Sequence, residues 1–178
     1  MITSNEKMIL PPGITIRNHF EPGDVGTIVY LHGSLYAREH GWDHTFEAYV
    51  AGPLAEFVNS SSARERIWIV EKDGVVAGSV AIVETSPNAG QLRWFILHPD
   101  LRGLGLGRIL IEQIIAFCRE CQYHSIFLWT VSILEAAANL YSSVGFELIE
   151  QKKGQLGGVV VTEHKYVLSL QVKTDALK

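Results

Sequence analysis

Apolar residues follow two different periods along the chain, and these periods predict its helices and strands. The most regular helical spacing runs from Leu106 to Cys121. Further helices are expected over residues 24–37 and 134–144, and a helix capped by Asp43 is expected to run to about Val58. Alternating or short continuous apolar runs predict strands over residues 14–20, 67–71, 75–84, 91–97, 125–131, 146–150 and 159–170.

The order of these elements predicts the fold class. Consecutive strands joined by the Asp73-Gly74 pair indicate antiparallel hairpins, and the later strand–helix–strand alternation indicates a parallel crossover. We therefore expect an α/β (mixed α+β) single domain, with a mixed, mostly antiparallel sheet of about seven strands and helices on both faces. The domain is predicted to span residues 13–171, between an N-terminal extension (1–12) and a C-terminal tail (172–178).

Composition and charge exclude several classes of protein. The 178 residues are 47% hydrophobic and 19% charged, as in a globular domain with a core. The formal net charge of −4 disfavours nucleic acid as a partner. The N-terminus lacks the features of a secretory signal, and no window approaches the ~18 apolar residues of a membrane span. We therefore expect a soluble cytoplasmic protein that does not bind membranes.

Metal and redox chemistry are not expected. Cys118 and Cys121 form a CxxC motif at the end of the predicted helix, where the helix dipole does not lower a thiol pKa. No second cysteine pair completes a zinc site, and His40 and His44 do not belong to an HExxH motif. We expect the cysteines to serve packing.

The sequence RGLGLGR, residues 102–108, connects a predicted strand to the most regular predicted helix. The start of a helix exposes about four N–H groups without internal partners, and glycines let a phosphate approach them. The loop lacks the lysine of an ATPase phosphate-binding loop, and Arg108 stands where the dinucleotide-binding pattern needs its third glycine. Neither nucleotide motif fits, and glycines that only form a tight turn remain an alternative.

The spacing Arg102-x-x-Gly105-x-Gly107 matches the Q/R-x-x-G-x-G/A signature of the GCN5-related N-acetyltransferase (GNAT) family. The preceding HPDLRG and the segment from Ala137 to Phe146 also resemble that family, and the likeness covers nearly the whole chain, most strongly residues 75–150. The stretch LRWFILHPDLRGLGLG resembles most the acetyltransferase domains found fused to MarR-type winged helices.

The resemblance implies acetyl-CoA as co-substrate, bound where two central strands separate. The residues that it assigns to cofactor binding are Ile96, Leu97, His98, Arg102, Gly103, Leu104, Gly105, Leu106, Gly107, Arg108 and Asn139. The pyrophosphate would accept hydrogen bonds from loop N–H groups, and the N–H of Leu97 would polarise the thioester oxygen. The acceptor would be a primary amine of a small molecule or peptide. A homodimer is also consistent with the resemblance, because family members often pair through their late strands.

The resemblance implies a general acid but leaves the general base open. Tyr141 holds the position of the family's general acid, with packing at a helix end as the alternative. The usual glutamate base is replaced by Gln91, which cannot accept a proton, so Glu84 is the candidate base. The other candidate bases are the histidines at 32, 40, 44 and 98. Trp42, Phe46 and Tyr49 form either an aromatic wall for the amine or ordinary core.

We therefore expect an acetyl-CoA-dependent N-acetyltransferase that works by direct attack of the amine in a ternary complex. The main alternative is a non-catalytic acyl-CoA sensor, which the glutamine at position 91 favours. A nucleotide-binding regulatory domain is a third alternative, and competition between ATP or NAD and CoA distinguishes it.

Overall fold

One mixed sheet organises residues 10–171, the part of the chain that the computed structural model describes. Its strands are β1 (Ile14–Arg17), β2 (Arg66–Lys72), β3 (Val75–Ser86), β4 (Ala89–Leu97), β5 (Ser125–Val131), β6 (Glu147–Leu156) and β7 (Val159–Ser169). They are ordered β1-β2-β3-β4-β5-β7-β6, and every neighbouring pair is antiparallel except β4 and β5. The predicted mixed, mostly antiparallel sheet is confirmed.

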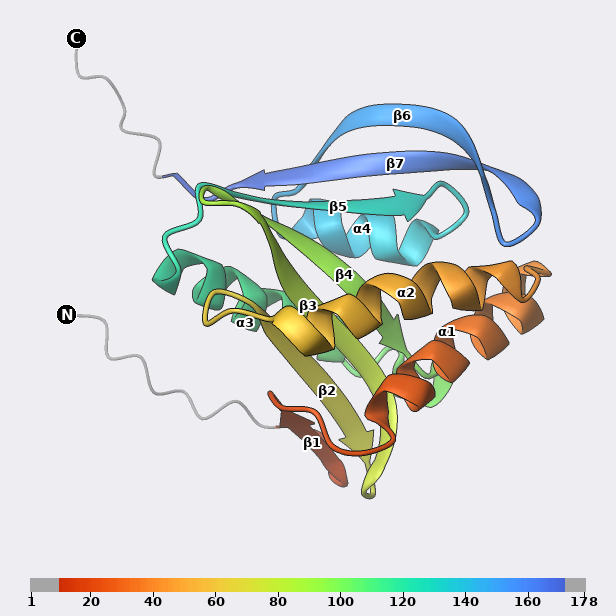
Figure 1. Cartoon of the computed structure of the whole chain (residues 1–178). Coiled ribbons are helices and arrows are strands. Elements are labelled where there is room, and N and C mark those ends of the chain that lie inside the picture. The colour runs from red at the N-terminus through yellow and green to blue at the C-terminus, as the bar shows by residue number, and fades with distance from the viewer. Residues whose placement is uncertain (1–9, 172–178) are drawn as a thin grey trace, which may run out of the picture.

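Helices cover both faces of the sheet (Figure 1). They are α1 (Asp24–His40), α2 (Thr45–Ser60), α3 (Leu106–Glu120) and α4 (Glu135–Ser143), with a short 3₁₀ helix at Pro99–Leu101. On one face, Leu54 of α2 is fully buried in a cluster with Ile69 of β2. On the other, Ile114 of α3 and Tyr141 of α4 share a cluster with Leu128 of β5. The two helical layers therefore enclose separate cores.

Most element boundaries differ from the prediction by one to three residues, and the end of β6 differs most. The strand predicted over 146–150 continues to Leu156 as β6, whose exposed polar half lies at the sheet edge and carries no apolar alternation. The first strand ends at Arg17, whose guanidinium turns to the buried Asp24 at 2.7 Å. Helix α2 begins at Thr45, and Asp43 accepts the Thr45 N–H at 3.0 Å from outside the helix. Residues 1–9 and 172–178 of the predicted extensions lie outside the described residues.

A β-bulge at Trp94 interrupts the alternation of side chains along β4. Opposite Ser79 to Ala81 of β3, the ladder on β4 runs from Ile96 to Arg93, so β4 carries one residue more. Trp94 takes a positive φ of 49°, and its carbonyl accepts a 2.8 Å hydrogen bond from the buried Ser79 hydroxyl. That hydrogen bond satisfies a carbonyl that the bulge removes from the regular ladder.

Strands β4 and β5 pair only at their beginnings. The ladder joins Ala89–Gln91 to Ser125–Phe127, and beyond these residues no pairing is present between the two strands. Figure 1 shows β4 and β5 diverging from this common start. The space between the diverging strands, called the β4–β5 gap below, faces α1 and α2 on one side and α3 and α4 on the other.

Candidate active site

Two cavities adjoin the β4–β5 gap. The loop cavity, of about 290 Å³, lies between α1, the end of β4, the residue 102–108 loop and α4. The aromatic cavity, of about 140 Å³, lies between α1, α2, β4, β5 and β7. The residues that line both cavities are Tyr36, Phe95, Leu134, Ala137 and Tyr141. A molecule in one cavity can therefore meet a molecule in the other.

The three glycines of the loop meet two different requirements. Gly103 and Gly105 have φ angles of 76° and 78°, in the left-handed region that side chains disfavour. Gly107 lies in the first turn of α3, where an added Cβ would come within 2.9 Å of the Leu140 side chain. Two glycines thus form the turn, and the third lets α3 approach α4.

The backbone of this loop carries a series of free donors. Within the described residues, the first hydrogen bond of α3 runs from the Ile109 N–H to the Gly105 carbonyl at 3.2 Å. Within residues 10–171, the N–H groups of residues 103–108 donate no backbone hydrogen bond, as expected for a helix start. Together with the helix dipole, they form a site suited to a phosphate group.

The open edge of β4 supplies a further donor beside the loop. The His98 N–H bonds the Ala77 carbonyl of β3 at 2.8 Å, so it points away from the gap. Backbone groups of successive strand residues point to opposite edges, which turns the N–H of Leu97 toward the gap. The Leu97 carbonyl on that edge accepts a 3.1 Å hydrogen bond from Arg102.

The structure brings most, but not all, of the predicted binding residues to the loop cavity. Those that line it are Ile96, Leu97, Arg102, Gly103, Gly105, Leu106 and Gly107. His98, Leu104, Arg108 and Asn139 do not. His98 caps the 3₁₀ helix by accepting the Asp100 N–H, and Asn139 lies on the exposed face of α4. These two side chains therefore lie outside the loop cavity.

The two arginines that flank the loop hold it to its neighbours. Arg102 forms an ion pair with Glu39 of α1 at 2.9 Å, and Arg108 donates to the Ser143 hydroxyl of α4 at 2.8 Å. Both guanidinium groups remain about half exposed. These contacts fix the loop between α1 and α4, while its N–H groups remain free.

Tyr141 lies where the two cavities meet. Its side chain is 5% exposed and packs against Phe95, Phe146 and Tyr166. The packing that the sequence offered as the alternative is therefore present, and Tyr141 also lines both cavities. Burial raises the pKa of the phenol well above its usual value. The hydroxyl therefore stays protonated at neutral pH and can act as a donor.

The candidate bases are distributed differently from the prediction. Glu84 lies at the far end of β3, lines neither cavity, and pairs with Arg64 at 3.1 Å. Gln91 lines the aromatic cavity and is the last residue of β4 that pairs with β5. Of the four histidines, His32 lines the aromatic cavity and His40 the loop cavity. The structure thus does not bring Glu84 to this site.

His32 is a buried neutral histidine. Its Nδ1 lies 2.8 Å from the Ile28 carbonyl, which can only accept, so Nδ1 carries the proton and Nε2 is a bare acceptor. The ring packs near Tyr36 and Phe46, and burial lowers its pKa to about 4. It presents a hydrogen-bond acceptor without a charge to the aromatic cavity.

The rest of the aromatic cavity combines predicted and unpredicted residues. Trp42, Phe46 and Tyr49 line it, and the first two are also buried core. Sequence reasoning missed Tyr36 of α1, Arg93 of β4, Trp129 of β5 and Glu163 of β7. A polar residue two positions after Gln91, on a strand that is otherwise apolar, was the available signal for Arg93.

Other chemistry finds little support in the described residues. Between residues 10 and 171 there is no group of three or more histidine, cysteine or acidic side chains placed to hold a metal. Cys118 is fully buried, and burial raises its pKa to about 12, so the thiol is inert. No helix within the same range is long and apolar enough to cross a membrane.

The buried state of His32 makes stability depend on pH. The unfolded chain binds a proton at the ordinary histidine pKa of 6.5, and the folded chain only near 4, so stability falls as pH drops between these values. The free energy of unfolding of the parent should therefore fall on going from pH 7 to pH 4, and we expect His32→Phe to reduce this fall by about 3 kcal/mol. Urea unfolding at pH 7 and pH 4 checks it, with the exposed His124→Gln as control. Equal pH dependence in His32→Phe and the parent would show that His32 is not buried neutral.

Comparison with known proteins identifies the architecture that this site belongs to. The chain aligns with yncA from Salmonella typhimurium, solved with acetyl-CoA, at 21% identity and a TM-score of 0.73, covering 91% of this chain and 96% of that one. A spermidine N-acetyltransferase from Vibrio cholerae, solved with CoA and spermine, aligns at 20% identity and a TM-score of 0.67, covering 89% and 96%. At these identities the likeness establishes the fold.

Sequence comparison supplies the family. An uncharacterized N-acetyltransferase from Schizosaccharomyces pombe is 34% identical over 65 residues, which cover 36% of this chain and 40% of that protein. The chain thus spans less than half the length of this relative. The model of the acetyltransferase (GNAT) family matches residues 32–146, which include the glycine loop, Tyr141 and the open edge of β4. The chain belongs to the GNAT family of acetyltransferases.

Proposed function

We propose that this protein transfers an acetyl group from acetyl-CoA to a primary amine held in the aromatic cavity. The observation that carries the proposal is the meeting of two cavities at Tyr141, one beside a loop of free N–H groups and the other walled by aromatic side chains. When bound, acetyl-CoA supplies an activated acetyl group as a thioester. The test is a screen of amines with acetyl-CoA that follows the release of free thiol.

The residues of the loop cavity fit such a co-substrate. The free N–H groups of residues 103–108 would bind the pyrophosphate. Gly103 and Gly105 leave open space beside these groups, because nothing lies within 4 Å of where their Cβ atoms would be. The unpaired edge of β4 would bind the pantetheine arm as an added strand does. The N–H of Leu97 would then donate to the thioester oxygen, where negative charge develops.

The acceptor amine needs to lose a proton, since the pKa of a free alkylamine is about 10.4. In the aromatic cavity, the Nε2 of His32 and the side-chain oxygen of Gln91 are acceptors that can orient the amine. Glu163 is the carboxylate among the lining residues, although Lys152 stands 3.9 Å from it. Tyr141 would donate its proton toward the departing thiolate.

The role of the glycine loop can be separated from its backbone strain. Gly105 and Gly74 have φ angles of 78° and 79°, and neither has an atom within 4 Å of an added Cβ. Gly105→Val and Gly74→Val should therefore both lose about 1–3 kcal/mol of stability. Only Gly105→Val should weaken acetyl-CoA binding, by roughly 10- to 100-fold, measured by calorimetry. Unchanged affinity in Gly105→Val would remove the loop from the cofactor site.

The role of Tyr141 is tested by removing its hydroxyl. Tyr141→Phe should retain acetyl-CoA affinity and lower kcat by roughly 100-fold, the usual scale for a lost general acid. The matched control is Tyr166→Phe, because Tyr166 is also buried, packs on Tyr141 at 6.0 Å between ring centroids, and lines neither cavity. Equal kcat in the two variants, with the chemical step rate-limiting, contradicts the assignment.

A second outcome of the amine screen bears on the whole proposal. A protein that binds acetyl-CoA but acetylates no amine across a broad panel is not a transferase for amines. That result would favour the acyl-CoA sensor, for which the glutamine at position 91 is the supporting feature.

A further inference from the structure

The aromatic cavity contains an arginine, Arg93, that forms no ion pair with any residue between 10 and 171. Arg93 lines this cavity beside Gln91, Tyr49 and Trp129. Within the described residues, its guanidinium makes no ion pair and no hydrogen bond. It lies over the Trp94 ring, 4.9 Å from the ring centroid. An arginine in such a position is available to a bound molecule.

The β-bulge explains why this arginine faces the cavity. Trp94 belongs to the apolar cluster between the sheet and α2. Arg93 interacts electrostatically with Glu56 of α2, so it lies on the same side of the sheet. Neighbouring strand residues ordinarily face opposite sides of a sheet, so two consecutive residues on the α2 side are a consequence of the bulge. Ala81, the residue opposite Arg93 on β3, is fully buried in the same cluster.

The guanidinium is also partly removed from water. Arg93 is half-buried, and burial lowers its pKa, although the value stays far above neutral for any arginine. Glu56 attracts it electrostatically but does not come within ion-pair distance, and Glu56 itself is exposed. A partly desolvated cation without a counter-ion costs free energy, which a bound anion recovers.

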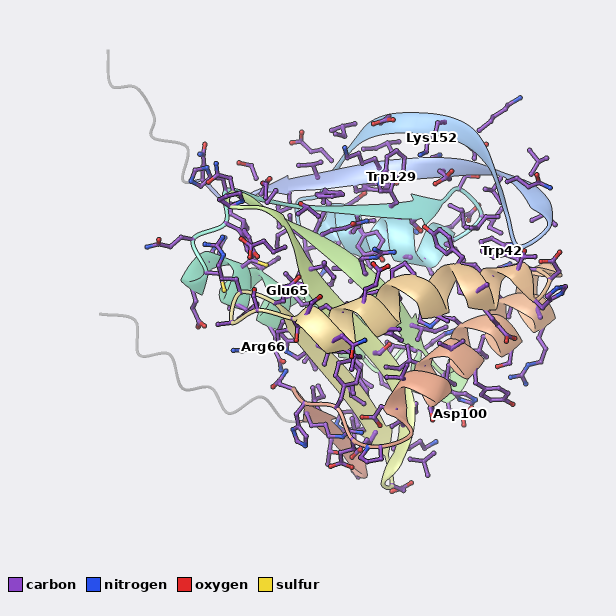
Figure 2. All side chains as sticks on the ribbon, viewed as in Figure 1. Trp42, Glu65, Arg66, Asp100, Trp129 and Lys152 are labelled. Carbon is purple, nitrogen blue, oxygen red and sulfur yellow. The ribbon has the colours of Figure 1, made fainter. Side chains whose placement is uncertain are left out.

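The remaining charges argue against a polycationic acceptor. Arg93 and Glu163 are the charged residues that line the cavity, and Lys152 lies 3.9 Å from the Glu163 carboxylate. Lys152 of β6 also lies over the ring of Trp129 of β5 at 4.1 Å, and Figure 2 shows both residues in the part of the sheet that β5, β7 and β6 form. The cavity is thus not acidic, as a site for a polyamine would need to be.

The size of the cavity indicates a compact acceptor. A cavity of about 150 Å³ holds one benzene molecule, and the aromatic cavity has about 140 Å³. The Asp43 N–H donates to the Gly157 carbonyl at 2.9 Å, which ties the α1–α2 turn to the β6–β7 turn. Gly157 packs so closely on Trp42 that an added Cβ would overlap the indole, and Figure 2 shows Trp42 at this junction. This contact holds Trp42, which lines the cavity, against the β6–β7 turn.

We propose that the acceptor is a small amino acid whose carboxylate binds Arg93 while its amine points toward Tyr141. The proposal rests on the proposed acetyl transfer and names its substrate class. A guanidinium can bind a carboxylate through two parallel hydrogen bonds, and Gln91, on the same strand face, can add a third. The aromatic wall would hold the amino acid side chain. The neutral amine would form the amide C–N bond as the thioester C–S bond breaks, Tyr141 would give its proton to the CoA thiolate, and the proton that the amine nitrogen loses would restore the Tyr141 hydroxyl.

The experiment compares matched acceptors that differ only in the carboxylate. Each common L-amino acid is assayed beside its methyl ester and its decarboxylated amine, by thiol release from acetyl-CoA. The parent should prefer its best amino acid over both analogues by roughly 10- to 100-fold in kcat/KM. Arg93→Gln should lose this preference, mainly through KM, and Arg93→Lys should retain part of it because the charge remains. Arg119→Gln, an exposed change on α3, should leave it intact.

A binding measurement separates failure of this proposal from failure of the proposed transfer. Calorimetry with the CoA-saturated protein reports amino acid binding whether or not any acetyl group moves. If no acceptor is acetylated, but an amino acid binds and Arg93→Gln abolishes that binding, the transfer is wrong and the carboxylate site stands. Decarboxylated amines that serve or bind as well as amino acids, or a preference that survives Arg93→Gln, would overturn the carboxylate site. Absence of amino acid binding overturns it as well.

Discussion

Beyond Gln91 and Phe127, β4 and β5 no longer share hydrogen bonds, so each strand leaves backbone donors and acceptors unpaired on that edge. Unpaired backbone groups are costly when they are buried and unhydrated. Here they border two cavities, and in β4 they end at a loop with further free N–H groups. The separation of two central strands thus creates the space that a co-substrate and an acceptor can share.

Other contacts position the groups that border this separation. The Ser79 hydroxyl supports the bulge at Trp94, and the bulge turns both Trp94 and Arg93 toward the α2 side. Arg102 and Arg108 hold the loop to α1 and α4, so the donors have a fixed position before any ligand arrives. Hydrogen-bond donors with fixed positions interact strongly with charge that develops in a site shielded from water, because the donors need not reorient during the reaction.

The sequence predicted those parts of the fold that depend on local pattern. Strand β5 was predicted with its observed bounds, and α3 to within one residue, because both carry strong apolar periodicity. The polar half of β6 was missed, since its pairing with β7 at the sheet edge needs no apolar residues. The bulge at Trp94 was also missed, because it depends on a hydrogen bond from Ser79, far away in sequence.

The site residues also divide into those that a local motif predicts and those that only the tertiary structure brings together. Gly103, Gly105 and Tyr141 stand in short motifs, and the structure brings all three to the β4–β5 gap. Glu84 was chosen for its place at a strand end, but its carboxylate pairs with Arg64 outside both cavities. His32, Arg93 and Glu163 come from separate elements, and no local pattern reveals that one cavity unites them. Their roles follow only from tertiary contacts.

The central claim, that the open edge of β4 and the glycine loop together hold acetyl-CoA, is tested most directly by hydrogen–deuterium exchange. Acetyl-CoA should slow exchange at the N–H of Leu97 and at residues 103–108, because these donors would gain acceptors. The paired interior strands β2 and β3 should change little, since their donors are already bonded. Protection confined to another surface, or no protection at saturating acetyl-CoA, would contradict the account.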